Sequence, residues 1–201
     1  MLPAQITSRN RTIYNQQFLI VGLGNPGRNY RGNRHNLGFI LVDHLAARLS
    51  LSFTRMQSKA LVTQGEYEGK SVVLAKPQTF MNLSGQAVSG LVRFYKLPLV
   101  NLLVAYDDVD LPLGSLRLRP SGGSGGHKGM ESIIVQLGNQ DFPRLRLGVD
   151  RPPDRMEAAD YVLQNFSRDE LESLPQTLDR AVDAVLVFLN EGLQQAMTDF
   201  N

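Results

Sequence analysis

The loop from Arg28 to Asn36 carries the residues best suited to chemistry. It holds His35 among three arginines and several asparagines. Histidine is the side chain whose unperturbed pKa lies closest to neutral pH, so His35 is a candidate general base. Arginines beside such a base favour an anionic ligand, a phosphate above all. Asn36 directly precedes a helical pattern and is a candidate N-cap.

Candidate partners for this histidine follow a run of apolar residues, at Asp107, Asp108 and Asp110. A carboxylate at the end of a buried strand can bind the far ring nitrogen of a histidine and fix its tautomer. The same cluster of acids can instead hold a divalent cation such as Mg²⁺. The spacing leaves both interpretations open.

Two further polar segments combine possible structural and functional roles. Asn82 and Ser84 open a second helical pattern, where either can cap the helix or bind a ligand. The stretch 121–129 is rich in glycine and carries His127 and Lys128. Its backbone amides can cradle a phosphate, or the stretch can serve as a mobile connector.

Glycines at positions 22, 24 and 27 form the Gly-x-Gly-x-x-Gly pattern of dinucleotide-binding proteins. That fingerprint depends on a helix that begins inside the motif and directs its amides at a pyrophosphate. Here a polar loop follows, and the helical pattern starts only near Leu37. We therefore expect a tight turn at the carboxyl end of a strand, where α/β sheets usually bind ligands, and no dinucleotide site.

The elements that must position these residues alternate between strand and helix patterns. Apolar runs predict strands at 18–23, 101–106, 116–119 and 144–149, and a hairpin formed by 61–67 and 71–76. Apolar residues at helical spacing predict helices at 37–49, 84–97, 130–137 and 174–189. This order predicts a single α/β domain over residues 18–201, with a largely parallel or mixed sheet. Residues 1–17 have few apolar anchors and are expected to form a flexible N-terminal extension.

Charge is unevenly distributed along the chain. The net charge is +7 over residues 1–60, +1 over 61–150 and −6 over 151–201. The basic first third favours a polyanionic partner, although separately solvated faces would give the same pattern. An acidic C-terminal part would repel phosphates, so such a partner is expected to approach from the opposite side.

Several classes of protein are excluded by composition. The chain has no cysteine, which rules out disulfides, thiolate metal sites and cysteine nucleophiles. Its apolar runs are far shorter than the roughly 20 residues of a membrane span, and its first residues lack an apolar signal sequence. We therefore expect a cytoplasmic protein that does not enter the membrane.

Together, these motifs resemble those of the bacterial-type peptidyl-tRNA hydrolases, over roughly residues 18–190. Four separated motifs occur in the family's order, which makes the resemblance specific. They are Val21-Gly-Leu-Gly-Asn-Pro-Gly27 with Tyr30 and Arg34-His-Asn36, Phe80-Met-Asn-Leu-Ser-Gly85, Asp107-Asp-Val-Asp-Leu-Pro112, and Gly125-Gly-His-Lys-Gly129.

The resemblance implies a monomeric enzyme with a twisted mixed β-sheet flanked by α-helices. It implies hydrolysis of the ester between peptide and tRNA in peptidyl-tRNA, which recycles tRNA from stalled translation without a metal, an organic cofactor or an obligate protein partner. By their place in the motifs, His35 would be the general base and Asp107 would orient it. Contacts to the peptide, the CCA end and the acceptor stem would come from Asn25, Tyr30, Met81, Asn82, Arg119, His127 and Lys128.

Two positions depart from the family's pattern. Asn33 stands where the family usually has threonine, a polar change that should leave the base in place. Lys128 stands where the family usually has asparagine, and a charged lysine can donate a hydrogen bond but cannot accept one. We expect reduced or redistributed activity rather than none. The alternatives are a non-catalytic RNA-binding relative, similar to a splicing factor of the same fold, and a metal-dependent hydrolase that uses the aspartates.

The start of the acidic C-terminal part also carries a prediction. Pro152 and Pro153 interrupt the chain before a short helical pattern. A segment of this kind can close over a binding site, so residues 150–166 are expected to form a flexible lid.

Overall fold

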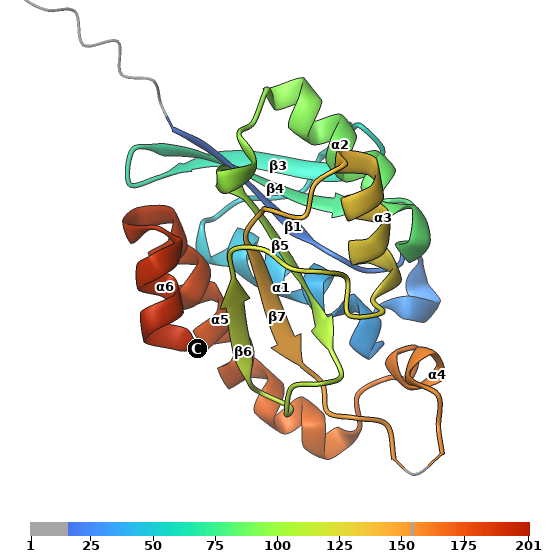
Figure 1. Cartoon of the computed structure of the whole chain (residues 1–201). Coiled ribbons are helices and arrows are strands. Elements are labelled where there is room, and N and C mark those ends of the chain that lie inside the picture. The colour runs from blue at the N-terminus through green and yellow to red at the C-terminus, as the bar shows by residue number, and fades with distance from the viewer. Residues whose placement is uncertain (1–15, 154) are drawn as a thin grey trace, which may run out of the picture.

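A seven-stranded sheet forms the centre of the computed structural model, which describes residues 16–153 and 155–201 (Figure 1). The strand order is β2-β3-β4-β1-β5-β7-β6, with the four strands from β4 to β7 parallel and the outer strands antiparallel. The strands are β1 (Gln17–Gly22), β2 (Arg55–Gln57), β3 (Ala60–Tyr67), β4 (Lys70–Pro77), β5 (Leu102–Asp108), β6 (Leu116–Arg119) and β7 (Arg144–Gly148). The predicted α/β fold with a mixed sheet is confirmed.

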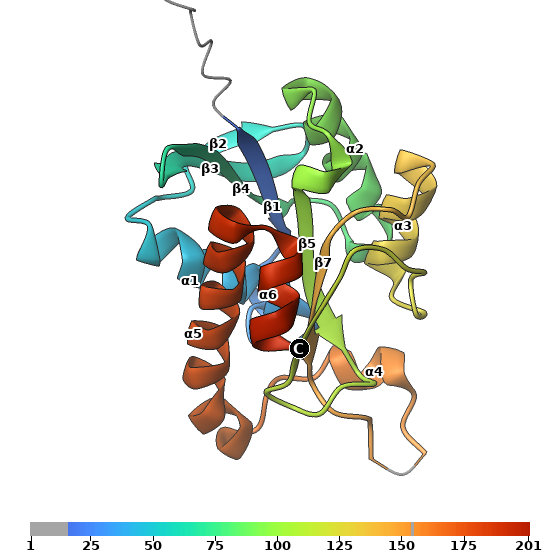
Figure 2. The same cartoon turned by 60° about the vertical axis from the view of Figure 1, so that its left-hand side comes forward.

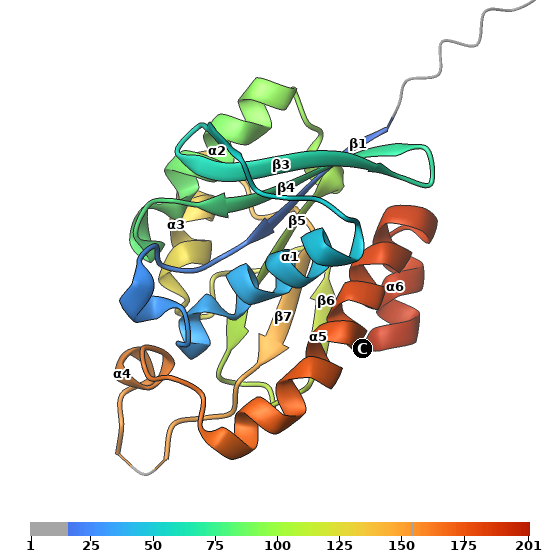
Figure 3. The same ribbon diagram turned by 180° about the vertical axis from the view of Figure 1, so that it is seen from behind.

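Helices cover both faces of this sheet (Figures 2 and 3). They are α1 (Leu37–Arg48), α2 (Ser84–Tyr95), α3 (Lys128–Leu137), α4 (Ala158–Val162), α5 (Arg168–Glu191) and α6 (Leu193–Phe200). Helices α1, α5 and α6 pack on one face, and α2 and α3 pack on the other. None of the helices among the described residues combines the length and apolarity that crossing a membrane requires.

Strand β1 shows why both faces need helices. Its side chains alternate, so Phe18 and Ile20 enter the core beneath α1 and α5, while Leu19 and Val21 enter the core beneath α2 and α3. All four are buried, and a strand buried on both faces reads as a continuous apolar run. This apolar run is the pattern from which the sequence predicts the strand.

The C-terminal elements differ most from the sequence prediction. Helix α5 begins at Arg168, six residues before the predicted start, because Ser167 and Glu170 form a capping box. The prediction overlooked β2 and α6, which are short and therefore give little periodic signal. Helix α4 lies in the segment predicted to form a lid.

The predicted N-terminal extension falls almost wholly outside the described residues. Residues 1–15 are not described, and β1 begins at Gln17, inside the range assigned to the extension. The domain boundary at residue 18 therefore stays a prediction that is close to the observed start of the sheet.

The strands and helices leave an opening at the carboxyl ends of β1 and β5. The chain leaves β1 through α1 on one face of the sheet and enters β5 through α2 on the other face, so a crevice forms between these neighbouring strands. Helix α1 approaches the sheet very closely there. A Cβ atom on Gly22 would lie 2.0 Å from the carbonyl oxygen of Gly38, so both positions need glycine.

Candidate active site

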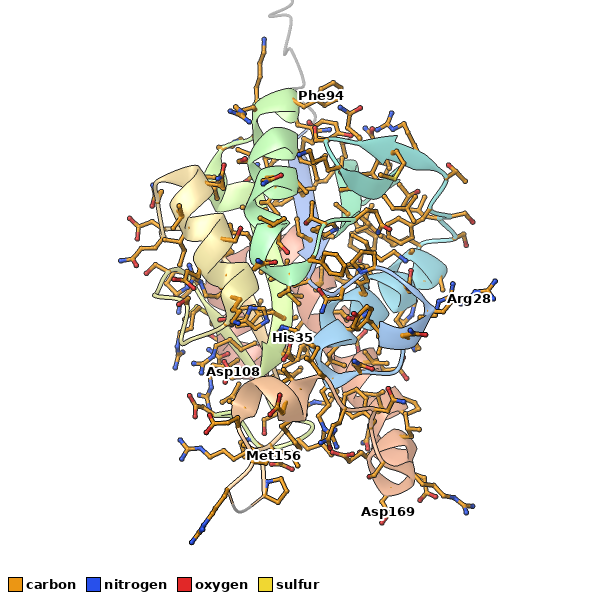
Figure 4. All side chains as sticks on the ribbon, turned by 90° about the vertical axis from the view of Figure 1, so that its right-hand side faces the viewer. Arg28, His35, Phe94, Asp108, Met156 and Asp169 are labelled. Carbon is orange, nitrogen blue, oxygen red and sulfur yellow. The ribbon has the colours of Figure 1, made fainter. Side chains whose placement is uncertain are left out.

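A cleft of about 510 Å³ opens at this end of the sheet. Figure 4 labels two of its lining residues, His35 and Asp108. The cleft has a volume in the range typical of small-molecule sites. It is lined by Asn25, His35, Phe80, Met81, Asn82, Tyr106, Asp107, Asp108, Val109, Ser124, Gly125, Gly126, His127, Lys128, Ala158, Ala159, Val162 and Leu163. Seven of the nine residues predicted from the sequence as catalytic or binding therefore meet in one place, contributed by four separated stretches of chain.

The predicted pair of His35 and Asp107 is in direct contact at the bottom of this cleft. The Nδ1 atom of His35 lies 3.0 Å from each carboxylate oxygen of Asp107, which is 3% exposed. A carboxylate accepts hydrogen bonds, so the proton of the neutral imidazole resides on Nδ1. The Nε2 atom of His35 is then unprotonated and has no partner among the described residues. Such a nitrogen can accept a proton from a water molecule in the cleft.

His127 contacts the same carboxylate, and its ring centroid lies 4.8 Å from that of His35. Its Nε2 atom lies 3.2 Å from Oδ1 of Asp107, while its Nδ1 atom accepts hydrogen bonds from the amides of Gly129 and Met130. His127 is thus the N-cap of α3, and the two amides require an unprotonated Nδ1. Its proton must lie on Nε2 and point at Asp107. The helix terminus therefore fixes the tautomer of His127.

The two histidines keep Asp107 ionised. Burial by itself would raise the pKa of this carboxyl, but attraction to His35 and the hydrogen bond from His127 outweigh burial and hold the pKa well below its usual range. Beside them, burial raises the pKa of Tyr106 to about 12, so its hydroxyl stays protonated at neutral pH. The base and its carboxylate thus lie beside a neutral phenol.

His35, Asp107 and His127 also form the one candidate metal-binding group among the described residues. The hydrogen bonds of His127 argue against that use. A metal on Nε2 would require the imidazole proton on Nδ1, where it would face two amide N–H groups. The residues present therefore fit a hydrogen-bonded triad better than a metal site.

The alternative cation site built on three aspartates is contradicted by the directions in which those aspartates point. Asp108 forms an ion pair with Arg146, and Asp110 forms one with Arg151. Asp107 faces the histidines. A divalent cation needs several oxygen atoms converging on one point, and these carboxylates bind separate partners instead.

Asn25 is held so that one polar group of its side chain remains available. The backbone amide of Asn25 donates to Oδ1 of Asn36 at 2.8 Å, and its carbonyl oxygen accepts a hydrogen bond from Nδ2 of Asn36 at 2.9 Å. The Oδ1 atom of Asn25 accepts a hydrogen bond from the backbone amide of Met81. The Nδ2 group has no partner among the described residues, and Asn25 lines the cleft. Asn36 occupies the N-cap position of α1 as predicted, but its side chain clamps Asn25 rather than capping the helix.

The segment before α2 forms a second side of the cleft. Asn82 is exposed at the cleft and Met81 is buried against α3, where a Cβ atom on Gly129 would lie 2.5 Å from its sulfur atom. The predicted capping role is wrong for both candidates, because neither Asn82 nor Ser84 occupies the N-cap position of α2. The polar group of Asn82 is therefore free for a ligand.

A buried arginine holds the glycine-rich stretch before α3 in place by hydrogen bonds. Arg144 donates hydrogen bonds to the carbonyl oxygens of Gly122, Gly123 and Gln140 and lies over the ring of Phe142. Its guanidinium is thus bound by backbone carbonyls rather than by a carboxylate. A stretch predicted as a possible mobile connector is anchored at its N-terminal part, and no sequence pattern indicated this role of Arg144.

The loop that carries His35 is fastened in a similar way. Arg34 is 6% exposed and binds both carboxylate oxygens of Glu170, the nearer at 2.6 Å. It also donates to the carbonyl oxygen of Asn165 and lies 4.3 Å over the ring of Tyr161. From its sequence, Arg34 is predicted to be one of three ligand-binding cations in this loop. The structure instead assigns it to an internal contact, which we call the Arg34 clasp.

The remaining predicted residues lie at different distances from the cleft. Lys128 lines it as the first residue of α3, with an exposed side chain. Tyr30 and Arg119 are not among the lining residues. Tyr30 belongs to a short 3-10 turn after β1, and Arg119 ends the edge strand β6.

Several further lining residues are not among the predicted catalytic or binding residues, although Phe80 belongs to a quoted motif and residues 158–163 lie in the predicted lid. Phe80 is 57% exposed at the cleft, and Ala158, Ala159, Val162 and Leu163 form an apolar wall from α4 and the residue after it. Alanine and leucine are ordinary helix residues, so only their placement in three dimensions marks them. An exposed aromatic ring beside polar asparagines suits a ligand with both apolar and polar parts.

The comparisons with known proteins point to one family. A family model described as peptidyl-tRNA hydrolase matches residues 19–201. A peptidyl-tRNA hydrolase from Chloroflexus aurantiacus is 54% identical over 185 residues, which cover 92% of this chain and 98% of the relative. A chloroplastic peptidyl-tRNA hydrolase from Arabidopsis thaliana is 51% identical over 185 residues, 92% of this chain; the match spans 64% of that longer relative.

A solved structure shows the same fold. The crystal structure of peptidyl-tRNA hydrolase from Acinetobacter baumannii superposes with a TM-score of 0.85 at 34% sequence identity. The match covers 92% of this chain and 94% of that chain. The likeness therefore extends over most of the fold described above.

Proposed function

This chain belongs to the peptidyl-tRNA hydrolase family, and on that premise we propose that its cleft hydrolyses the ester between the peptide and the tRNA of peptidyl-tRNA. It is then a carboxylic ester hydrolase acting in translation. The observation that carries the proposal is the contact between Asp107 and Nδ1 of His35, which leaves the other ring nitrogen of His35 directed at the cleft.

The reaction needs a nucleophile, and a water molecule activated by His35 supplies it. The Nε2 atom of His35 accepts a proton as the water oxygen bonds to the ester carbonyl carbon. The imidazolium that results is stabilised by the ionised carboxylate of Asp107. When the tetrahedral intermediate collapses, the bond to the ribose oxygen breaks and that oxygen takes the proton. Neither step requires a metal or an organic cofactor.

Amide groups in the cleft are suited to the substrate's carbonyl oxygens. The unpartnered Nδ2 group of Asn25 can donate to the oxygen that becomes negative in the intermediate, a contribution on the order of 3 kcal/mol for one well-placed donor. Asn82 at the cleft can bind the peptide bond next to the ester. Free aminoacyl-tRNA lacks that peptide bond and carries an ammonium group instead, so it would bind poorly. Met81 provides an apolar contact beside these amides.

Contacts to the tRNA would lie outside the catalytic centre. Arg117 and Arg146 are direct cross-strand partners, so with Arg119 they share one face of the β6–β7 pair. Because Arg146 pairs with Asp108, Arg117 and Arg119 supply the positive charge for the phosphates of the acceptor stem. Lys128 and Tyr30 are further candidates near the CCA end. We propose that one chain acts alone, in the cytoplasm; the compartment stays a prediction, since the Arabidopsis relative is described as chloroplastic.

The test is hydrolysis of N-acetyl-aminoacyl-tRNA by the natural protein and by His35→Ala, each with and without EDTA. We expect the natural protein to release the N-acetyl-amino acid rapidly, at a rate that EDTA does not alter. The rate should fall at least about a hundredfold in His35→Ala. Free aminoacyl-tRNA should release little amino acid. Loss of activity in EDTA would instead support a metal-dependent hydrolase.

The second candidate function is RNA binding without catalysis, and the observation that favours it is Lys128 in the cleft. A binding protein has no need of an oriented base, so the contact between His35 and Asp107 favours the enzyme. Measurable tRNA binding with no release of the N-acetyl-aminoacyl group would reverse this conclusion.

A further inference from the structure

A row of positive charges follows α2 away from the cleft. Lys59 donates to the side chain of Gln86 in the first turn of α2, and Arg55 donates to the hydroxyl of Tyr95 in its last turn. The β2–β3 segment thus runs alongside this helix. Arg93 and Lys96 add two more exposed cations at the far end. We call these four cations, with Phe94, the α2 track.

The charges of the α2 track are not neutralised within the protein. Among the described residues, none of its four cations forms an ion pair. Between Asp43 and Asp107 the sequence contains only two acids, Glu66 and Glu68, and both lie at the β3–β4 turn. Such a surface attracts an extended polyanion.

The aromatic residues at the far end of the α2 track point to a nucleic acid. Phe94 is 56% exposed although it is a large apolar side chain, and its ring meets that of Tyr95 edge to face at 4.9 Å. Exposed aromatic rings among cations are the combination that stacks on bases or riboses while the cations bind phosphates.

The location of the α2 track allows a tRNA bound in the cleft to reach it. Helix α2 begins directly after Met81 and Asn82 at the cleft and has 12 residues, a length of about 18 Å. Figure 4 shows Phe94 at the end of α2 that is remote from His35. A ligand whose 3′ end occupies the cleft can therefore reach all four cations along one helix.

Helix stability accounts for only part of the α2 track. Cations in the last turn of a helix interact favourably with its dipole, which suits Arg93 and Lys96. Arg55 and Lys59 are not in the helix, and the dipole gives no reason for an exposed Phe94. A common ligand explains all of these features together.

We propose that the α2 track is a second binding surface for the tRNA body, in contact with backbone phosphates beyond the CCA end. This inference rests on the proposed function, since it assigns the substrate's 3′ end to the cleft. It predicts that the cations contribute to binding of the substrate and leave the chemical step unchanged.

The test uses two charge-neutralising double variants, Arg55→Gln with Lys59→Gln and Arg93→Gln with Lys96→Gln. The matched control is Arg168→Gln with Arg180→Gln, which removes the same charge from exposed positions of α5 on the other face of the sheet. Each variant is assayed on full-length N-acetyl-aminoacyl-tRNA and on the same ester carried by a CCA trinucleotide. Thermal unfolding verifies that all of them are folded.

With full-length substrate we expect each track variant to raise KM about three- to tenfold at unchanged kcat. The slope of log(kcat/KM) against log salt concentration should become shallower by about 0.7–0.9 for each phosphate that the variant no longer neutralises. The trinucleotide ester and the control variant should show no change. Equal KM values for track and control variants on full-length substrate would overturn the inference, as would an equal effect on the trinucleotide.

Binding of deacylated tRNA, measured by fluorescence anisotropy, gives the same comparison without turnover. Weaker binding by the track variants alone would support the inference, even if the protein shows no hydrolase activity. In that case the proposed function would fail, but the role of the α2 track in tRNA binding would stand. Unchanged binding in both track variants would overturn the inference whatever the activity.

Discussion

At the scale of single residues, the site depends on where the imidazole protons lie. Asp107 accepts hydrogen bonds from two imidazoles, and each imidazole has its tautomer fixed by its surroundings. His35 is fixed by the carboxylate itself, whereas His127 is fixed by two backbone amides at the start of α3. The base is thus prepared for its task before any substrate binds, and His127 has a structural role and an electrostatic role at once.

Substitution at His127 can separate these two roles. Asparagine is a good N-cap but cannot span the distance to Asp107, whereas alanine can do neither. We expect His127→Asn to keep thermal stability and lose about tenfold in turnover, and His127→Ala to lose the same turnover and about 1 kcal/mol of stability. Denaturant unfolding and steady-state kinetics measure both effects. Full turnover in His127→Asn would show that the hydrogen bond to Asp107 is dispensable.

Lys128 carries the second prediction at this scale. His35, Asp107 and Asn25 are all in place without it, so Lys128→Asn should change kcat by less than about a hundredfold, the effect of one oxyanion donor. Single-turnover hydrolysis of N-acetyl-aminoacyl-tRNA checks this. A larger rise would mean that the natural protein is not primarily an enzyme.

At the scale of elements, the Arg34 clasp joins two parts of the chain that are far apart in sequence. The amide of Arg34 donates to the carbonyl oxygen of Gln164, and the amide of Phe166 donates to that of Gly32. The clasp thereby holds the loop that carries His35 against the end of the α4 segment. The same carboxylate, Glu170, takes part in the capping box of α5.

The clasp makes stability depend on pH. Burial alone would raise the pKa of Glu170, but hydrogen bonds from Arg34 and from the backbone of Ser167 lower it below its usual value. The carboxylate therefore contributes stability above the unfolded-state pKa of about 4.3, and this contribution disappears as pH falls through the lower folded-state pKa.

We expect Glu170→Gln to lose about 2 kcal/mol at pH 7 and to show a weaker decline in stability below about pH 4.3. Urea unfolding across this pH range measures it. The matched control is Ser167→Ala, which removes one capping hydrogen bond and a smaller cause of the lowered pKa of Glu170 but keeps the ion pair, so its pH dependence should stay closer to that of the natural protein than that of Glu170→Gln. Equal curves for Glu170→Gln and the natural protein would contradict this account.

At the scale of the whole molecule, the sheet separates two electrostatic environments. Helix α5 carries most of the acidic C-terminal part on one face, and α2 and α3 lie on the other with the cleft beside them. A polyanion is therefore attracted to the cleft side and repelled from α5. The approach of tRNA from the side opposite the acidic part stays a prediction, and α4, which belongs to that part, also lines the cleft.

The predicted lid at 150–166 is fastened at its C-terminal end by the backbone bonds of Gln164 and Phe166. We expect hydrogen exchange to show slow amides at these two residues and faster exchange at Arg151, whose amide has no backbone partner among the described residues. Uniform protection from 150 to 166 would contradict the lid. Exchange at Phe166 should also quicken in Glu170→Gln, since the clasp holds this segment.

The sequence by itself determined most of the strands, most of the helices and the residues with chemistry. Continuous apolar runs indicate buried strands wherever they occur, as at Phe18–Val21, because burial on both faces requires them. His35 was recognisable from its residue type in a polar loop before a helix, and Asp107 from its place after a strand, whereas the role of Asn25 came from the family resemblance. The motif resemblance then specified the family, which the comparisons confirm.

Only the tertiary structure decided which partner each polar side chain has. Arg34 looked like a ligand-binding cation and is half of a buried ion pair. Asn36 looked like a cap and clamps Asn25, and Arg144 began a predicted strand without any sign that it anchors the glycine-rich stretch. A polar side chain acts through the atom within about 3 Å of it, and such atoms come from residues up to 136 positions away in this chain. Local patterns report burial and backbone shape, so they cannot identify partners that only folding brings together.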